Sequence, residues 1–274
     1  MAADLLTIGT IALIPTGLTV RRIYRRTAGS RATLARQLAS LSCGIRSEFV
    51  EQTLGVAEFS RTKGRLTERV YVTRHAYVQT VADPDGSIVW WAITTVDAQF
   101  RPRFTLPPMS SDGQQWSVHL GRTRFSQLDK PSAIRWFRGA RPFGYTESYW
   151  FGNPGNSLTY VASHSDLGVG EIGFEGLDEL QDHTHGELPS GEWVIECLPG
   201  QLSTTTAPLA LIRRSTVINT FGVGGVDIDL KSFPWTLGAD SDHVRILRSV
   251  AVSYSGRYGQ LREILRRLRS RSKG

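Results

Sequence analysis

The opening of the chain is the feature that most restricts how it can fold. Residues 5–20 read LLTIGTIALIPTGLTV and carry no charge, and a cluster of four arginines follows at once: Arg21, Arg22, Arg25 and Arg26. Sixteen helical residues extend about 24 Å. The flanking residues and snorkelling arginine side chains close most of the gap to a hydrocarbon core about 30 Å thick. The sequence therefore predicts a single-pass transmembrane helix over residues 1–23, and the alternative is an N-terminal helix buried in a globular domain.

The position of the arginines predicts the orientation of this helix. A cleavable signal peptide carries its positive charges before the apolar run and a small-residue cleavage site after it. This segment reverses that order. Under the positive-inside rule the arginine cluster stays in the cytoplasm. We therefore expect a protein of the inner cell membrane whose C-terminal domain is cytoplasmic.

The distribution of charge favours contact with a membrane surface. Residues 1–46 and 257–274 each carry a net charge of +6, which leaves −5 on the rest of a chain whose total is +7. A nucleic-acid-binding domain normally carries its basic patch on the folded body, so nucleic acid is an unlikely partner on charge grounds. Basic ends around an acidic body favour an anionic lipid membrane. The tail 257–274 is predicted to be a basic amphipathic segment that contacts lipid through Arg262, Arg266, Arg267 and Arg269, and the alternative is a solvated, frayed terminus.

Composition excludes several classes of protein. The chain has 274 residues, of which 40% are hydrophobic and only two are cysteine. These values rule out disulfide-dense, collagen-like and wholly disordered chains. Cys43 and Cys197 form no C-x-x-C pair, which favours a reducing compartment.

Hydrophobic periodicity predicts one helix followed by a sheet-rich domain. Large apolar side chains recur at helical spacing over Leu34–Phe49, with Ser30 as the N-cap and Gly55 as the stop signal. Residues 24–56 are therefore assigned to a juxtamembrane amphipathic helix. Residues 57–256 are predicted to form an α+β domain of mostly antiparallel sheet with a few packed helices.

Two turns and one break organise this domain. Asp83-Pro84-Asp85-Gly86 predicts a hairpin with a glycine at positive φ, and a second hairpin is predicted around Gly152–Asn156. The proline-rich stretch 101–108 separates two candidate halves, 57–108 and 114–256. An L-G-x-x-x-F pattern occurs at 54–59 and again at 120–125, which is compatible with a repeated helix-plus-hairpin unit, although two short matches do not establish one. The predicted strands are 69–73, 77–82, 87–95, 116–120, 145–151, 157–163, 192–198, 209–213, 216–223 and 244–253, and the predicted short helices are 126–137 and 174–180.

Catalytic or metal-binding chemistry has weak support in the sequence. His183 and His185 alternate, so on a strand they would share one face and could ligate one metal. Ser163-His164-Ser165-Asp166 contains the residue types of a catalytic triad, but no G-x-S-x-G motif occurs. The candidate third ligands are His164, Glu187 and Cys197, and none has diagnostic spacing. We therefore predict no catalytic residue, metal or cofactor.

Aromatic pairs and a glycine run mark particular strands. On a strand, Trp90-Trp91 and Tyr149-Trp150 each place one large ring on the less buried face. Trp91 and Trp150 are therefore candidates for a surface that binds a partner, and the alternative for both is a second packed layer. The glycine-rich run 222–226 is not followed by the Lys-Ser/Thr pair of a phosphate-binding loop. We therefore expect a bent or bulged strand there.

Several segments together resemble a known group of proteins. They are YRRTAGSR at 24–31, YVQT at 77–80, ITT at 93–95, FRPRF at 100–104, LGRTRF at 120–125 and YWFGNPGN at 149–156. The chain resembles an uncharacterised family of membrane-anchored bacterial proteins found chiefly in actinobacteria. The resemblance covers residues 18–165 and implies an anchor with a cytosolic domain. It supplies no catalytic residues.

These features lead to one expected function and two alternatives. The expected function is a membrane-tethered cytosolic domain that binds or scaffolds a protein partner without catalysing a reaction. The first alternative is a hydrolase or metal-dependent enzyme built around His164, His183, His185 and Asp166. The second is a nucleic-acid binder that uses the two basic ends.

Overall fold

The structure, a computed structural model, describes residues 30–107, 115–138, 143–153, 156–173, 193–196, 207–225 and 238. Several predicted features lie outside the described residues: the transmembrane segment 1–23, the helix 174–180, the histidine pair with Glu187 and Cys197, the strand 244–253 and the tail 257–274. Within the described part, no helix combines the length and the apolar character needed to span a bilayer. The chain divides into two compact units, Met1–Leu41 and Ser42–Gly274.

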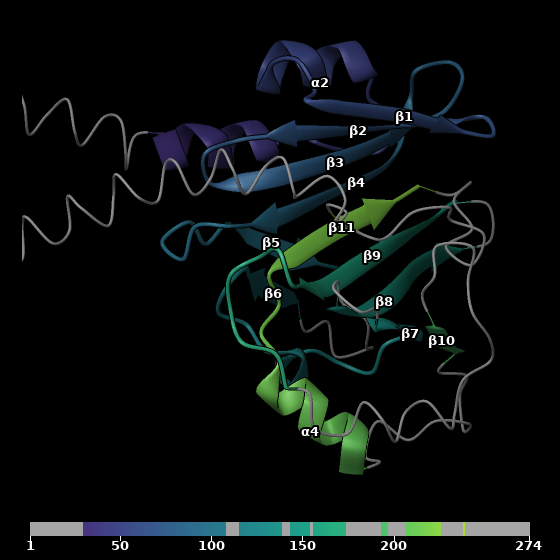
Figure 1. Cartoon of the computed structure of the whole chain (residues 1–274). Helices are drawn as coiled ribbons and strands as arrows, with labels where there is room; N and C mark the ends of the chain where they lie inside the picture. Colours follow the sequence, from purple (N-terminus) through teal and green to yellow (C-terminus); the bar gives the residue numbers. More distant parts are fainter. Residues whose placement is uncertain are drawn as a thin grey trace, which may run out of the picture. The chain divides into compact units, whose positions relative to one another are not determined.

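A nine-stranded antiparallel sheet dominates the second unit, which agrees with the predicted α+β class (Figure 1). In spatial order its strands are β1 (Phe59–Lys63), β2 (Leu66–Val72), β3 (Ala76–Ala82), β4 (Ile88–Thr95), β11 (Thr220–Gly224), β9 (Asn156–Ser165), β8 (Phe143–Asn153), β7 (Ala133–Arg138) and β10 (Trp193–Glu196). A separate two-stranded sheet consists of β5 (Arg103–Leu106) and β6 (Trp116–His119).

The order of the strands joins the two candidate halves of the domain. Strands β1 to β4 pair consecutively, as do β7 to β9, and β11 lies between β4 and β9 (Figure 1). The first half therefore contributes four strands to the same sheet as the second. The stretch 101–108 does not simply break the sheet, because its residues Arg103–Leu106 form β5 and pair with β6.

Both predicted hairpins are confirmed. The amide of Gly86 donates to the carbonyl of Asp83 at 3.0 Å, and Gly86 has a φ of 79°. The Asp83 carboxylate also accepts the amide of Ser87 at 2.9 Å. Strands β8 and β9 pair without interruption from Gly144–Ser165 to Asn153–Asn156. The residues that favour a turn lie within each turn itself, so both hairpins could be predicted from the local sequence.

The prediction of one continuous helix after Ser30 is wrong. Residues 30–38 are helical in the first unit, and a separate helix α2 (Ser47–Leu54) begins the second. Gly44 has a φ of 86°, its amide donates to the carbonyl of Ile88 at 2.7 Å, and the amide of Ile88 donates to the carbonyl of Ile45 at 2.8 Å. Residues 44–45 thus pair with the start of β4, which competes with helical hydrogen bonding. Helix α2 stops at Gly55 as expected, with a φ of 94°.

The predicted helix over residues 126–137 is also wrong. One 3-10 turn, η1 (Phe125–Gln127), is followed by strand β7. Pro131 has no amide hydrogen and disfavours a helical conformation in the residue before it. Beyond Pro131, Ile134 and Trp136 are buried on the face that carries Glu147 and Tyr145, with which they pair, and Arg135 between them is buried on the other face.

The predicted strand over residues 209–213 is instead part of helix α4 (Ala207–Ser215). Its buried residues are Leu209, Ile212 and Arg213; the last two lie three and four positions after Leu209, which places all three on one helical face. Pro208 falls in the first turn, where a missing amide hydrogen costs little. A short apolar run does not by itself distinguish a buried strand from a helix.

The two faces of the large sheet differ in what covers them. The core face carries Trp91, Phe221 and Tyr145. Phe104 of β5 stacks on Phe221 at a centroid distance of 4.6 Å, and Phe125 of η1 meets Tyr145 edge-on at 4.9 Å. We call the residues that pack here the cover layer; it comprises residues 101–107, 115–130 and 207–215. The opposite face, which we call the hydroxyl face, carries the threonine and serine side chains described below.

Candidate functional site

The two candidate partner-binding tryptophans have different surroundings. Trp91 is 5% exposed, with Phe104 and Phe221 at centroid distances of 6.1 and 6.0 Å. Because β5 covers Trp91, the structure corrects its assignment to a partner surface and places it in the second packed layer. Trp150 is 59% exposed, while its neighbour Tyr149 is 1% exposed. The expected alternation is thus present at this pair.

Trp150 lies near the end of the long hairpin formed by β8 and β9. It pairs with Thr159 across the strands, and its backbone amide donates to the hydroxyl of Ser132 at 3.2 Å. Tyr149 faces the cover layer, so the alternation of the strand directs Trp150 to the hydroxyl-face side. A large aromatic side chain held on a paired strand, with its ring in solvent, is suited to contact with another molecule.

The part of the candidate enzyme site that the structure describes does not form a nucleophile–base pair. Ser163 and His164 are adjacent on β9, so their side chains lie on opposite faces of the sheet. The Ser163 hydroxyl bonds to Thr146 at 2.7 Å on the hydroxyl face. His164 Nδ1 lies 2.7 Å from the carbonyl of Val217. Among the described residues, no group of three metal-ligating side chains occurs.

His164 has the environment of a buried structural histidine. It is 3% exposed, and burial lowers its pKa from the usual 6.5, although the hydrogen bond to Val217 opposes that effect. Since only a protonated Nδ1 can donate to a carbonyl, the ring that makes this hydrogen bond carries a hydrogen on Nδ1. This hydrogen bond ties the end of β9 to the segment that enters β11.

A buried ionic network, which sequence reasoning missed, lies on the core face. Tyr145, Glu147 and Tyr149 alternate on β8, and both tyrosine hydroxyls donate to the Glu147 carboxylate, at 2.7 and 2.5 Å. Arg213 of α4 donates to the same carboxylate at 2.8 Å. A second nitrogen of Arg213 donates to the carbonyls of Phe125, Leu128 and Asp129 at 3.1, 3.0 and 2.7 Å.

The electrostatics of this network indicate a structural role. Glu147 is fully buried, and burial raises its pKa, opposed by Arg213 and by the two tyrosine hydroxyls. Burial and the nearby carboxylate raise the pKa values of Tyr145 and Tyr149 well above 10. Both carboxylate oxygens are occupied within the protein. The network therefore fastens α4 and η1 to β8, and it presents no free group to a substrate.

A row of hydroxyl groups crosses the opposite face of the sheet. Thr94, Thr220, Ser163 and Thr146 are directly opposed, in that order, on β4, β11, β9 and β8. Thr94 and Thr220 are bonded at 2.8 Å, and Ser163 and Thr146 at 2.7 Å. All four side chains are buried, and each hydroxyl has a partner within the row. The row therefore consists of two bonded pairs, and two of its hydroxyls also donate outside it: Thr220 to the side-chain oxygen of Asn219 at 3.1 Å, and Ser163 to the carbonyl of Tyr145 at 3.2 Å.

The glycine run in β11 has a different role from the one its sequence suggested. A bent or bulged strand was expected over residues 222–226. In the described residues β11 pairs with β4 and β9 without a bulge up to Gly224, and residue 226 lies outside them. A Cβ atom on Gly222 would lie 2.7 Å from Cζ2 of Trp90 and 3.0 Å from the carbonyl oxygen of Trp91. Gly222 thus leaves room for the Trp90 ring, which is fully buried on the neighbouring strand.

Cys43 has the environment of an unreactive thiol. Its sulfur lies 3.6 Å from the carbonyl of Val89 and 3.5 Å from that of Val223. Burial raises its pKa from 9.0 to about 12. A thiol with this pKa holds almost no thiolate at neutral pH, so it is not suited to nucleophilic or redox chemistry.

No protein-family model, no curated protein and no solved structure matches the chain. The resemblance to membrane-anchored actinobacterial proteins therefore stays a prediction. Any functional proposal has to be argued from the sequence and from the geometry described above.

Proposed function

We propose that the protein is a membrane-tethered cytosolic domain that holds a protein partner at the inner face of the cell membrane, without catalysing a reaction. The observation that carries this proposal is the uncharged segment 5–20 followed directly by four arginines. A segment of this kind is stable in lipid, and its arginines favour the cytoplasmic side.

The mechanism is confinement. Tethering restricts the domain to a thin layer beside the bilayer, which raises its effective concentration toward any partner in that layer without adding a contact. The arginine cluster after residue 20 sets the topology. The basic tail 257–274 gives a second attachment to anionic lipid.

Two features of the described residues support binding rather than catalysis. Trp150 offers a large exposed aromatic ring on a well-paired strand. Ser163 and His164, from the alternative enzyme site, face opposite sides of the sheet and are bonded to other groups. These observations favour a surface that binds over a pocket that reacts.

Deleting residues 1–20 tests the tether. We expect the wild-type chain in the membrane fraction and the deletion variant in the soluble fraction, because the apolar segment is removed. Fractionation of the native host followed by immunoblotting measures this. The matched control replaces the four arginines at 21, 22, 25 and 26 with glutamine; it should stay in the membrane with mixed orientation. Unchanged fractionation of the deletion variant would rule out the anchor.

Photo-crosslinking from position 150 tests the partner surface. A photoreactive amino acid in place of Trp150 should give an adduct with a partner protein in the native host, because this side chain is exposed. The same amino acid in place of Trp91 should give none, since β5 covers that position. The adduct should weaken when residues 1–20 are deleted, as confinement requires. Absence of a specific adduct at position 150 would contradict the proposed partner surface.

A further inference from the structure

The cover layer is strongly basic on its outer surface. Its residues include only one carboxylate, Asp129, whose oxygen accepts the amide of the neighbouring Lys130 at 2.8 Å. Its arginine on the inner side, Arg213, is neutralised by Glu147. The remaining cations are Arg101, Arg103, Arg122, Arg124, Lys130 and Arg214.

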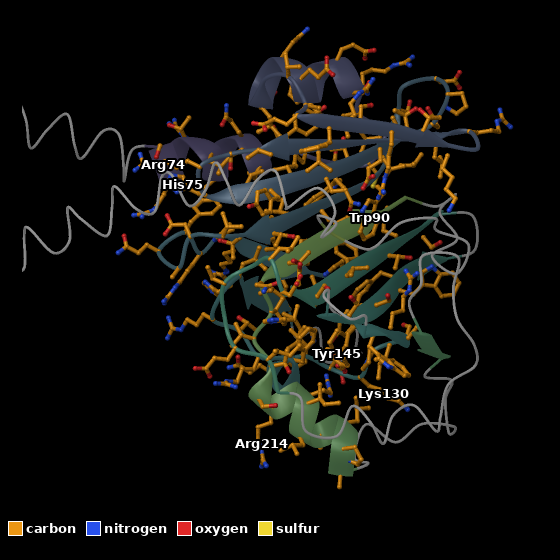
Figure 2. The ribbon with its side chains drawn as sticks, viewed as in Figure 1. Arg74, His75, Trp90, Lys130, Tyr145 and Arg214 are labelled. Atoms are coloured by element: carbon orange, nitrogen blue, oxygen red, sulfur yellow. The ribbon has the colours of Figure 1, made fainter. Side chains whose placement is uncertain are left out.

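Local structure directs two of these cations, Arg103 and Arg214, away from the sheet. On β5, Leu106 is buried and Phe104 packs on Phe221, so the alternate residue Arg103 faces outward. On α4, Leu209 and Ile212 are buried, while Arg214 is exposed. Figure 2 shows Arg214 projecting from the outer side of α4.

Hydrogen bonds hold two parts of this charged surface together. A terminal nitrogen of Arg124 donates to the carbonyls of Arg214 and Ser215, at 3.0 and 2.6 Å. This contact caps the C-terminal end of α4 and places the Arg124 charge beside the backbone of Arg214. Arg103 is held on β5 by two hydrogen bonds to the hydroxyl of Ser117, at 3.1 and 2.8 Å. Two charges of this surface, those of Arg103 and Arg124, are therefore held in place.

The excess of basic over acidic side chains is a property of the cover layer and does not extend to the other end of the sheet. There, acidic residues accompany the basic ones: Arg69 pairs with Glu51 of α2 at 3.6 Å, and Arg61 pairs with Glu68. Glu48 and Glu58 also fall within residues 47–66, the stretch of chain that contains Lys63 and Arg65. A general excess of arginine in the sequence therefore does not explain the basic cover layer.

We infer that the outer surface of the cover layer lies against the anionic lipid headgroups of the membrane to which the chain is tethered. This inference rests on the proposed function, since the tether holds the domain within reach of the bilayer. Several cations on one face are attracted to a negatively charged leaflet within about one Debye length. RNA also attracts basic surfaces, but the central part of the chain is acidic overall, which favours the membrane.

This arrangement would orient the partner surface. Tyr149 bonds to Glu147 and so faces the cover layer, and Trp150, the next residue on β8, faces the other way. With the cover layer on lipid, Trp150 is directed toward the cytoplasm. The membrane contact then presents the partner-binding side chain to soluble proteins.

Spin labels on the full-length protein in nanodiscs test this inference. Cys197 is replaced with serine, Cys43 is kept because its thiol is buried, and a label is attached to Thr105→Cys beside Arg103. The control label is on Lys63→Cys in β1, far along the sheet order. In nanodiscs rich in phosphatidylglycerol, we expect a several-fold lower accessibility of the label at 105 to a water-soluble nickel chelate. The label at 63 should be unaffected, and phosphatidylcholine nanodiscs or high salt should abolish the difference.

Charge variants and a competitor complete the test. The variant Arg103→Gln/Arg122→Gln/Arg214→Gln should expose the label at 105, and the control Lys63→Gln/Arg65→Gln, read by the same label, should not. Equal accessibility at 105 in both lipids would overturn the inference, as would stronger protection by an RNA oligonucleotide than by anionic lipid. Co-elution with nanodiscs reports the tether separately. If the chain does not co-elute with nanodiscs, the accessibility of the label at 105 is measured with phosphatidylglycerol vesicles instead. Lower accessibility to the nickel chelate would then support the lipid-binding surface, and unchanged accessibility would reject it.

Discussion

Replacing Arg213 with alanine is expected to lower the free energy of unfolding by about 3–5 kcal/mol, because it leaves a buried carboxylate without its cation. Glu147 is fully buried, and Arg213 is the one cation bonded to it among the described residues. The substitution also removes the donor to the carbonyls of Phe125, Leu128 and Asp129. Urea denaturation at neutral pH, followed by tryptophan fluorescence, measures the loss.

The neighbouring arginine supplies the matched control. Arg214→Ala removes an exposed side chain from the same helix and should change the free energy of unfolding by no more than about 0.5 kcal/mol. The double variant Glu147→Leu/Arg213→Met should recover part of the loss, because neither charge remains buried. If Arg213→Ala were as stable as Arg214→Ala, the network would not fasten α4 to the sheet.

The pH dependence of this loss follows from the pKa of Glu147. Burial raises that pKa, and removing Arg213 removes the largest effect that opposes the rise. A carboxyl with a raised pKa binds more protons in the folded state than in the unfolded state, so its cost to stability grows as pH rises. The difference between wild type and Arg213→Ala should therefore shrink as the pH falls from neutral toward about 5.

Gly222→Ala should cost about 2–3 kcal/mol, at the upper end of the range for overpacked cores. The new methyl group would lie 2.7 and 2.8 Å from two ring carbons of Trp90 and 3.0 Å from a backbone carbonyl. Trp90 has little freedom to move away, because it is fully buried and its indole nitrogen donates to Gln79 at 3.0 Å. Thermal and urea unfolding of the purified variant measure this effect.

A second glycine just beyond β11 serves as the control. A Cβ atom on Gly225 would have its nearest neighbours at 3.5 Å, an ordinary contact distance, so Gly225→Ala should be far less destabilising. Combining Gly222→Ala with Trp90→Phe should cost less than the sum of the two single changes, because the smaller ring frees the space that the methyl group needs. If the loss of stability in the double variant equalled the sum of the two single losses, residues 222 and 90 would not compete for the same space.

The elements that could be predicted from the sequence were those with strong local signals. The Asp83–Gly86 turn and the two strands beside it, which are rich in β-branched and aromatic residues, were specified by residues close together in the chain. Errors arose where a nonlocal contact decided the outcome. Residues 44–45 pair with Ile88, which divides the predicted helix, and the short apolar run in α4 became helical by packing Leu209 and Ile212 beneath it.

The residues of the candidate site were harder to predict from the sequence than the secondary structure was. Alternation correctly identified Trp150 as exposed, but it could not show that β5 covers Trp91. The Glu147–Arg213 pair joins residues 66 positions apart, and the hydroxyl row draws on four strands. One signal was present: Tyr145, Glu147 and Tyr149 alternate, which places a carboxylate between two phenols on one strand face.

The insertion of β11 has a consequence for how the chain reaches its native state during synthesis. Thr94 and Thr220, which meet in the sheet, are 126 residues apart, so β4 leaves the ribosome long before the strand that pairs with it. Until then β4 and β9 each have one edge without a neighbour, and open edges invite association between chains. A nascent chain held at the bilayer by its first residues would keep these edges of β4 and β9 unpaired beside the membrane until β11 is synthesised. Chaperone capture of ribosome-bound intermediates should therefore peak before residue 225 emerges.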